Sequence, residues 1–204
     1  MNDEIVIRPM DKHDDILKTA QLIYETAEEF SWALFGKKEI ALRKIKALIQ
    51  LDNNSFSRNN ILIACDKDRI YGILVGYKKN SINTKEQNKD FNKAMSLFAR
   101  LRCGLVMSFV DRIMNLNNIE GYYIQSLCVD SASRGKRIGY RLLEYCFKVN
   151  KEQGVNNVYL DLESTNKIAL NLYKKVGFEL FKESKMKTAG ISIYRMRKKL
   201  MQVT

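Results

Sequence analysis

The pattern of apolar and polar positions predicts strands and helices in alternation along the first half of the chain. Runs rich in β-branched residues lie at positions 4–8, 61–65 and 70–77, and the polar tetrapeptide between the last two is typical of a hairpin. Apolar residues spaced three and four apart predict helices over 14–30 and 40–51. We therefore expect a strand, two helices and then an antiparallel pair of strands.

The second half of the chain predicts two strand–turn–helix units. Apolar spacing predicts a helix from Phe91 to Leu116, followed by a strand over 122–129, a helix from Ile138 that stops at Gly154, and a strand over 158–162. A helix over 166–176, ended by Gly177, and strands at 178–181 and 191–196 complete the order. This pattern indicates one domain over residues 1–204, of mixed α/β (α+β) class. Residues 80–118 form a helical insertion before the fourth strand, which could be core, an oligomer interface or the mouth of a substrate site.

The composition excludes several kinds of site. The single histidine, His13, argues against a Ser-His-Asp protease and against a multi-histidine metal centre, so we expect no metal site. The four cysteines form no CxxC pair, and each lies in an apolar run. We interpret them as reduced core residues.

The charge of the chain is uneven. The formal net charge is +12; residues 1–64 carry nine basic and ten acidic side chains, whereas residues 65–204 carry 26 and 13. A polyanion, either a phosphate-rich cofactor or a nucleic acid, would therefore bind the later part. The acidic start and the absence of an apolar run near the ~20 residues of a membrane span predict a cytoplasmic protein without membrane contact.

The turn after the fourth predicted strand has the chemistry of a phosphate site. Four basic side chains, Arg134, Lys136, Arg137 and Arg141, fall within eight residues with no acid among them. The first backbone N–H groups of a helix have no partner within the helix and can donate to a phosphate group. Neither the P-loop nor the Rossmann glycine pattern fits this segment.

The segment from Leu127 to Gly139 resembles motif A of the GNAT superfamily of N-acetyltransferases, an L-x-V strand end followed by [RQ]-x-x-G-x-[GA]. Leu127, Val129, Arg134 and Gly139 match this pattern. Arg137 stands where the family has its first glycine, and we expect this residue to bar a left-handed backbone there.

The resemblance continues in residues 166–179, which are similar to motif B of the same family, N-x-x-A-x-x-[LF]-Y-x-x-x-G-F. The matching residues Asn166, Ala169 and Tyr173 are spaced to share one helix face and address one ligand. The resemblance implies a six- to seven-stranded, mostly antiparallel sheet with parallel, splayed strands four and five and helices on both faces. It also implies acetyl-coenzyme A as cofactor, held by Leu127, Cys128, Val129, Arg134, Gly135, Lys136, Arg137, Ile138, Gly139, Tyr140, Asn166, Ala169 and Tyr173.

The implied reaction is direct attack of a primary amine on the acetyl thioester. The backbone N–H of Val129 is our candidate oxyanion donor, and the resemblance assigns the general acid to Tyr173. Cys128 has no histidine to activate it as a nucleophile. For the base we consider Glu163, Glu120 and Tyr123, whereas the acids of the first helix, Glu25, Glu28 and Glu29, together with Trp32, could form a rim for a cationic amine.

The function expected from the sequence is therefore an acetyl-coenzyme A-dependent N-acetyltransferase acting on a small-molecule or peptide amine. The alternative is a non-catalytic acyl-coenzyme A-binding sensor or interaction module with the same fold. We expect no nucleic-acid partner, because the basic stretch over 195–199 alternates like a solvated strand. A homodimer is left open.

Overall fold

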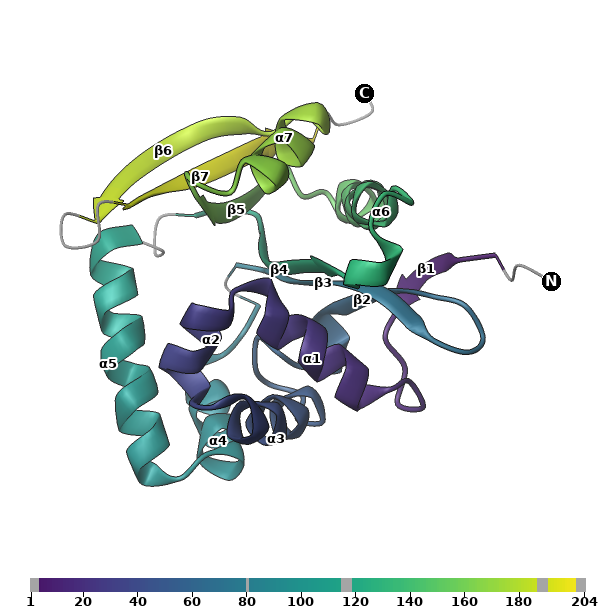
Figure 1. Ribbon diagram of the computed structural model, residues 1–204. Coiled ribbons are helices and arrows are strands. Elements are labelled where there is room, and N and C mark those ends of the chain that lie inside the picture. Colours follow the sequence, from purple (N-terminus) through teal and green to yellow (C-terminus); the bar gives the residue numbers. More distant parts are fainter. Residues whose placement is uncertain (1–3, 80, 115–118, 187–190, 201–204) are drawn as a thin grey trace.

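A single seven-stranded sheet organises the molecule in the computed structural model, which describes residues 4–79, 81–114, 119–186 and 191–200 (Figure 1). The strands are β1 (Val6–Pro9), β2 (Ile61–Cys65), β3 (Ile70–Lys78), β4 (Tyr122–Val129), β5 (Asn157–Glu163), β6 (Glu179–Met186) and β7 (Ile191–Lys199). Their spatial order is β1-β2-β3-β4-β5-β7-β6. Only β4 and β5 run parallel; the other neighbours are antiparallel. This confirms the expected fold class.

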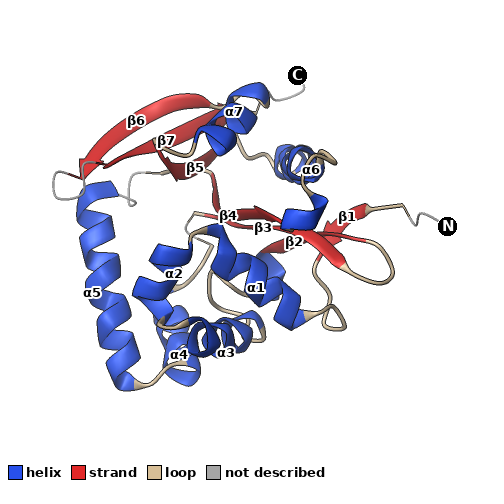
Figure 2. Cartoon of the chain, in the orientation of Figure 1, coloured by secondary structure: helices blue, strands red, loops and turns tan. Residues whose placement is uncertain are grey.

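Helices cover both faces of the sheet (Figure 2). One face is covered by α1 (Ile16–Thr26), α2 (Glu28–Phe35) and α3 (Lys38–Ile49), and the other by α6 (Ile138–Glu152) and α7 (Lys167–Lys175). Successive side chains of a strand point to opposite faces, so Ile73 of β3 packs under α1–α3 while its neighbour Leu74 packs under α6. The two apolar layers hold the sheet between them.

The expectation of one helix over residues 14–30 was wrong, because the chain forms two helices there. Ala27 has a non-helical backbone (φ −154°, ψ 82°), which ends α1 and starts α2. The start of α1 agrees with its acidic residues, since the Asp15 carboxylate accepts a hydrogen bond of 2.9 Å from the Lys18 amide. Three helices, rather than two, therefore lie between β1 and β2.

The insertion before β4 also holds two helices in place of the one expected from Phe91, α4 (Thr84–Ala94) and α5 (Leu97–Met114). An extended residue, Met95, separates them (φ −136°, ψ 145°). Leu116 lies outside the described residues.

The helix α5 contacts α2 and α4 and also reaches β6 at the far edge of the sheet (Figure 1). Ala99 and Cys103 on one of its faces are buried, whereas Phe98 and Leu105 on the opposite face are 79% and 75% exposed. None of the helices in the described ranges combines the length and the apolar character that crossing a membrane requires.

Candidate active site

The two parallel strands separate at the centre of the sheet. Pairing between β4 and β5 covers only Tyr122–Ile124 of β4, against residues 158–160 of β5. From Gln125 to Val129, the edge of β4 that faces β5 is paired with no strand of the described chain. This opening is the splay that the resemblance implies.

Backbone donors of β4 point into the opening. The Asp130 amide donates to the Tyr71 carbonyl at 2.8 Å, on the β3 side of the strand. Because consecutive residues of a strand direct their N–H groups to opposite edges, the Val129 amide points to the open side, and the Leu127 amide does the same. An ion pair between Asp130 and Lys18 of α1 holds the end of this strand.

The turn after β4 leads into the start of α6. Gly135 has a positive φ of 82°, and a side chain placed there would meet open space within 4 Å among the described atoms. Arg137, the residue before α6, adopts the left-handed conformation (φ 57°, ψ 20°). The expectation that arginine bars this conformation was therefore wrong: the chain keeps the backbone of the glycine pattern in spite of the Cβ clash that disfavours it.

The start of α6 presents polar hydrogens to the same turn. No side-chain hydrogen bond caps its N-terminus in the described chain, so the first-turn amides of residues 138–140 are available to a ligand. The side chains of Arg134, Lys136 and Arg137 are exposed there. Arg141 is directed elsewhere, because its guanidinium donates to the Ile5 carbonyl at 2.6 Å. Of the four basic side chains of the turn, three are therefore left without a partner among the described residues.

A buried hydroxyl adds a polar group next to this turn. Ser133, which is 1% exposed, immediately precedes Arg134, and its Oγ has no hydrogen-bond partner among the described residues. Buried polar groups are usually paired, so an unpaired one beside a cationic turn fits a site that a polar ligand completes.

The helix α7 lies next to the start of α6. The Asn166 side chain caps this helix, its Oδ1 accepting from the Ala169 amide at 3.1 Å, while the residue itself stays exposed. A Cβ at Gly139 would lie 3.4 Å from Leu172 of α7 and 3.6 Å from Val129 of β4. The glycine therefore brings α6, α7 and β4 to one point.

Tyr173 lies on the buried side of α7, 8% exposed, with its ring 5.7 Å from that of Phe178. Burial raises the pKa of its hydroxyl to about 12. The side chain consequently keeps its proton at neutral pH, as a proton donor must.

Cys128 is a buried thiol on the other face of β4. Burial raises its pKa to about 11, and the neighbouring Glu25 carboxylate contributes in the same direction. The other three cysteines are also buried and free, as expected. A thiol that remains protonated is a poor nucleophile, in agreement with direct transfer to an amine.

The sequence profile of the Acetyltransferase (GNAT) family matches residues 25–178, about three quarters of the chain. The chain belongs to this family.

Individual relatives of this GNAT chain are distant in sequence. The "GCN5-related N-acetyltransferase 6, chloroplastic" of Arabidopsis thaliana is 28% identical over 75 residues, which cover 37% of this chain and 26% of that protein. The match thus spans about a quarter of the relative's length. An N-acetyltransferase from Staphylococcus aureus Mu50 superposes with a TM-score of 0.74 at 19% identity, covering 95% of this chain and 100% of that one. A chain in the NatC complex bound to Gag peptide and CoA superposes with a TM-score of 0.59 at 17% identity, covering 97% and 99%.

The acidic and aromatic rim expected on the α2 side of this GNAT domain is only partly available. Glu28 and Glu29 lie exposed in the first turn of α2. Trp32 is 57% exposed, but the guanidinium of Arg102 from α5 lies 5.6 Å from its ring centre and donates to the carbonyl groups of Trp32 and Ala33. The Trp32 ring therefore already has a cationic partner within the chain, Arg102.

The carboxylates considered as bases lie at different ends of the opening. Glu163 is exposed at the end of β5, with the Thr165 hydroxyl 3.4 Å from its carboxylate. Glu120 precedes β4, at the end of the paired segment away from the opening. Of these two, only Glu163 is on the open side.

Sequence reasoning missed a buried polar cluster where the strands separate. Asp161 of β5 accepts hydrogen bonds from Arg195 of β7, at 2.8 and 2.9 Å, and from the Tyr123 hydroxyl at 2.9 Å. Burial and the Asp161 carboxylate hold the pKa of Tyr123 well above its usual value. Tyr123 is thus a hydrogen-bond donor here rather than a proton acceptor. The available signal was the acid in the middle of the apolar run 158–162 of β5, opposite Arg195 in register.

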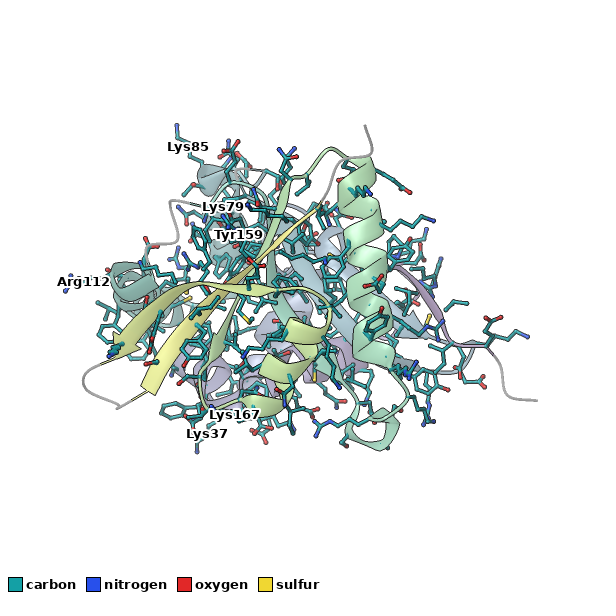
Figure 3. The ribbon with its side chains drawn as sticks, turned by 90° about the horizontal axis from the view of Figure 1, so that it is seen from above. Lys37, Lys79, Lys85, Arg112, Tyr159 and Lys167 are labelled. Atoms are coloured by element: carbon teal, nitrogen blue, oxygen red, sulfur yellow. The ribbon has the colours of Figure 1, made fainter. Side chains whose placement is uncertain are left out.

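The same face carries the aromatic residue Tyr159, 6% exposed, whose ring contacts that of Phe181. In Figure 3 Tyr159 lies among the side chains near the middle of the molecule, whereas Lys37, Lys85 and Arg112 point outward. The cluster is therefore an internal feature and not part of the basic surface.

Proposed function

We propose that this chain is an acetyl-coenzyme A-dependent N-acetyltransferase. The observation that carries the proposal is the unpaired edge of β4 from Gln125 to Val129, which leads directly to a cationic turn and an uncapped helix start. A ligand that combines a peptide-like arm with a diphosphate matches both parts.

Specific residues would hold the two parts of this ligand. The Val129 amide would pair with the pantetheine arm like a neighbouring strand, and the side-chain amide of the exposed Asn166 would contact the arm from α7. The amides of residues 138–140, with the cations of Arg134 and Lys136, would hold the diphosphate. The unpaired Ser133 hydroxyl supports this fit, because it has no partner in the described chain.

Bound acetyl-coenzyme A supplies an activated acetyl thioester. In the reaction the amine nitrogen forms the C–N bond, the C–S bond breaks, and the amine loses a proton while the sulfur gains one. The N–H of Leu127, the neighbour of Val129 on the open edge and the one nearer the acyl end, would stabilise negative charge on the acyl oxygen. Tyr173, which is protonated at neutral pH, would give its proton to the sulfur. Glu163, directly or through water, would accept the amine proton.

The acceptor is an amine of a small molecule or peptide, and we place the reaction in the cytoplasm. Glu28 and Glu29 would attract a cationic amine to the α2 side of the opening. The protein need not form a covalent acyl intermediate, since Cys128 holds its proton.

Calorimetry with acetyl-coenzyme A tests the cofactor site. We expect Gly139→Leu to weaken binding at least tenfold, because the new side chain would meet Leu172 and Val129. The matched control is Gly104→Leu on α5, where a Cβ meets no described atom within 4 Å. No binding heat with the unmodified protein would reject the proposal.

Thiol release with a panel of amines tests whether the chain is an enzyme. A non-catalytic binding module would bind acetyl-coenzyme A without releasing thiol.

A further inference from the structure

At the point where β4 and β5 separate, each strand has one residue that is the first to lie beyond the paired segment. Ile124 is the last residue of β4 paired with β5, so Gln125 is the first unpaired residue of β4 and Asp161 the first of β5. The β3–β4 register also shifts here: Val75 lies opposite Ser126, and Gly76 lies opposite Ile124. Gln125 is therefore the additional residue of a β-bulge, a feature that redirects side chains beside functional sites.

The bulge turns Gln125 toward the α1 side of the sheet. Ile124 and Leu127 both pack in the apolar layer under α6. With one additional residue between them, Gln125 and Ser126 point to the other face, on which Cys128 packs beneath α1–α3. This is the face of the Asp161 cluster and of the exposed acids of α2.

The side-chain nitrogen of Gln125 has no hydrogen-bond partner in the described chain. This atom, Nε2, is buried. The nearest acid by register is already engaged, because both oxygens of Asp161 accept from Arg195 and one of them also accepts from Tyr123. Buried donors without a partner are rare in native proteins and call for a specific explanation.

We propose that Gln125 is a further catalytic residue, whose side-chain amide donates a hydrogen bond to the acyl oxygen of the bound thioester. This rests on the proposed function. A pantetheine arm along Leu127 and Val129, with its diphosphate end at Arg134, must direct its acyl end toward the closed end of the opening, where Gln125 lies. The Gln125 amide then acts with the Leu127 backbone N–H as a second donor to the oxygen that gains charge.

The proposal predicts a change in ligand preference as well as in rate. A hydrogen bond to the acyl oxygen is absent with free coenzyme A, so the unmodified protein should bind acetyl-coenzyme A about 3- to 10-fold more tightly. In Gln125→Met, a nearly isosteric replacement, the ratio should fall to about one, and turnover with the amine identified by thiol release should fall about 10- to 100-fold. The melting temperature of the ligand-free variant should be unchanged or higher, because the replacement removes an unpaired buried donor.

The experiment is calorimetry with acetyl-coenzyme A and coenzyme A on the unmodified protein, Gln125→Met and Gln125→Glu, with Gln153→Met as the control on an exposed glutamine. Gln125→Glu, which replaces the donor by an acceptor, should lose the preference as well and keeps the test valid if the methionine variant does not fold. A preference within twofold of the unmodified protein in a folded variant would overturn the inference, as would a higher KM for the amine with the preference intact. If the unmodified protein binds neither compound, the proposed acetyl-coenzyme A site itself is wrong. A loss of binding is thus distinguished from binding without a preference, which contradicts only the role of Gln125.

Discussion

Single residues in the turn between β4 and α6 show both what the sequence predicts and what it cannot. The matches at Arg134 and Gly139 place the turn and the start of α6 correctly. The left-handed backbone of Arg137 was not predictable, because local sterics disfavour it and only the surrounding fold imposes it. The diversion of Arg141 to the Ile5 carbonyl joins residues far apart in sequence, which a local pattern does not record.

Arg137→Gly should stabilise the protein. Glycine adopts the left-handed backbone without a Cβ clash, so we expect the free energy of unfolding to rise by about 1 kcal/mol. Chemical denaturation measures this change. Arg137→Ala is the matched control, because it removes the same charge but keeps the strain. If both variants change stability equally, charge rather than backbone conformation accounts for the effect.

Tyr173→Phe should lower turnover by about 10²-fold, the usual contribution of a general acid, while the affinity for acetyl-coenzyme A changes less than about twofold. Steady-state kinetics and calorimetry measure the two effects. Tyr145→Phe, on the half-buried Tyr145 of α6, controls for the loss of a tyrosine hydroxyl near the core. Unchanged turnover in Tyr173→Phe would remove this residue from the mechanism.

At the scale of elements, the sequence predicts β4 and its neighbours well and helix interruptions poorly. Its β-branched and apolar run defines β4 at the same residues that the structure shows, and the glycines after α6 and α7 mark where those helices end. Apolar spacing continues through Ala27, so the change to a non-helical backbone at this one residue leaves no trace in the pattern.

The candidate site also combines features that the sequence predicts with features that it does not. The splayed strands and the buried tyrosine follow from the motifs, because each motif occupies one continuous segment. The Asp161 cluster and the unpaired Gln125 amide depend on strand register and on a bulge, and both are set by pairing between distant segments.

At the scale of the whole molecule, buried tyrosines and cysteines should make stability depend on alkaline pH. Burial raises the pKa of Tyr173 from 10.0 to about 12 and of Cys146 from 9.0 to about 12. The folded chain therefore holds these protons more tightly than the unfolded chain does. Their contribution is complete below about pH 9 and is lost as the pH rises toward 12.

The Tyr173 part of this effect can be isolated. In Tyr173→Phe, the decrease in unfolding free energy between pH 9 and pH 11 should be smaller than in the unmodified protein by about 1 kcal/mol. Urea denaturation at the two pH values measures the difference. Tyr145→Phe is again the control, and equal decreases in Tyr173→Phe and the unmodified protein would show that the Tyr173 proton is not held by the fold.

The short seam between β4 and β5 has a mechanical consequence. Three residue pairs are the only ladder that joins β1–β4 to β5–β7–β6 in the described sheet, and a seam of this length would by itself let the two halves swing. The inserted helix α5 contacts α2 below one half and β6 at the rim of the other. It therefore joins the two halves at a second place, in addition to the apolar cluster under α6 that spans both. An opening whose two sides are already fixed costs a bound molecule less free energy than one that must first close around it.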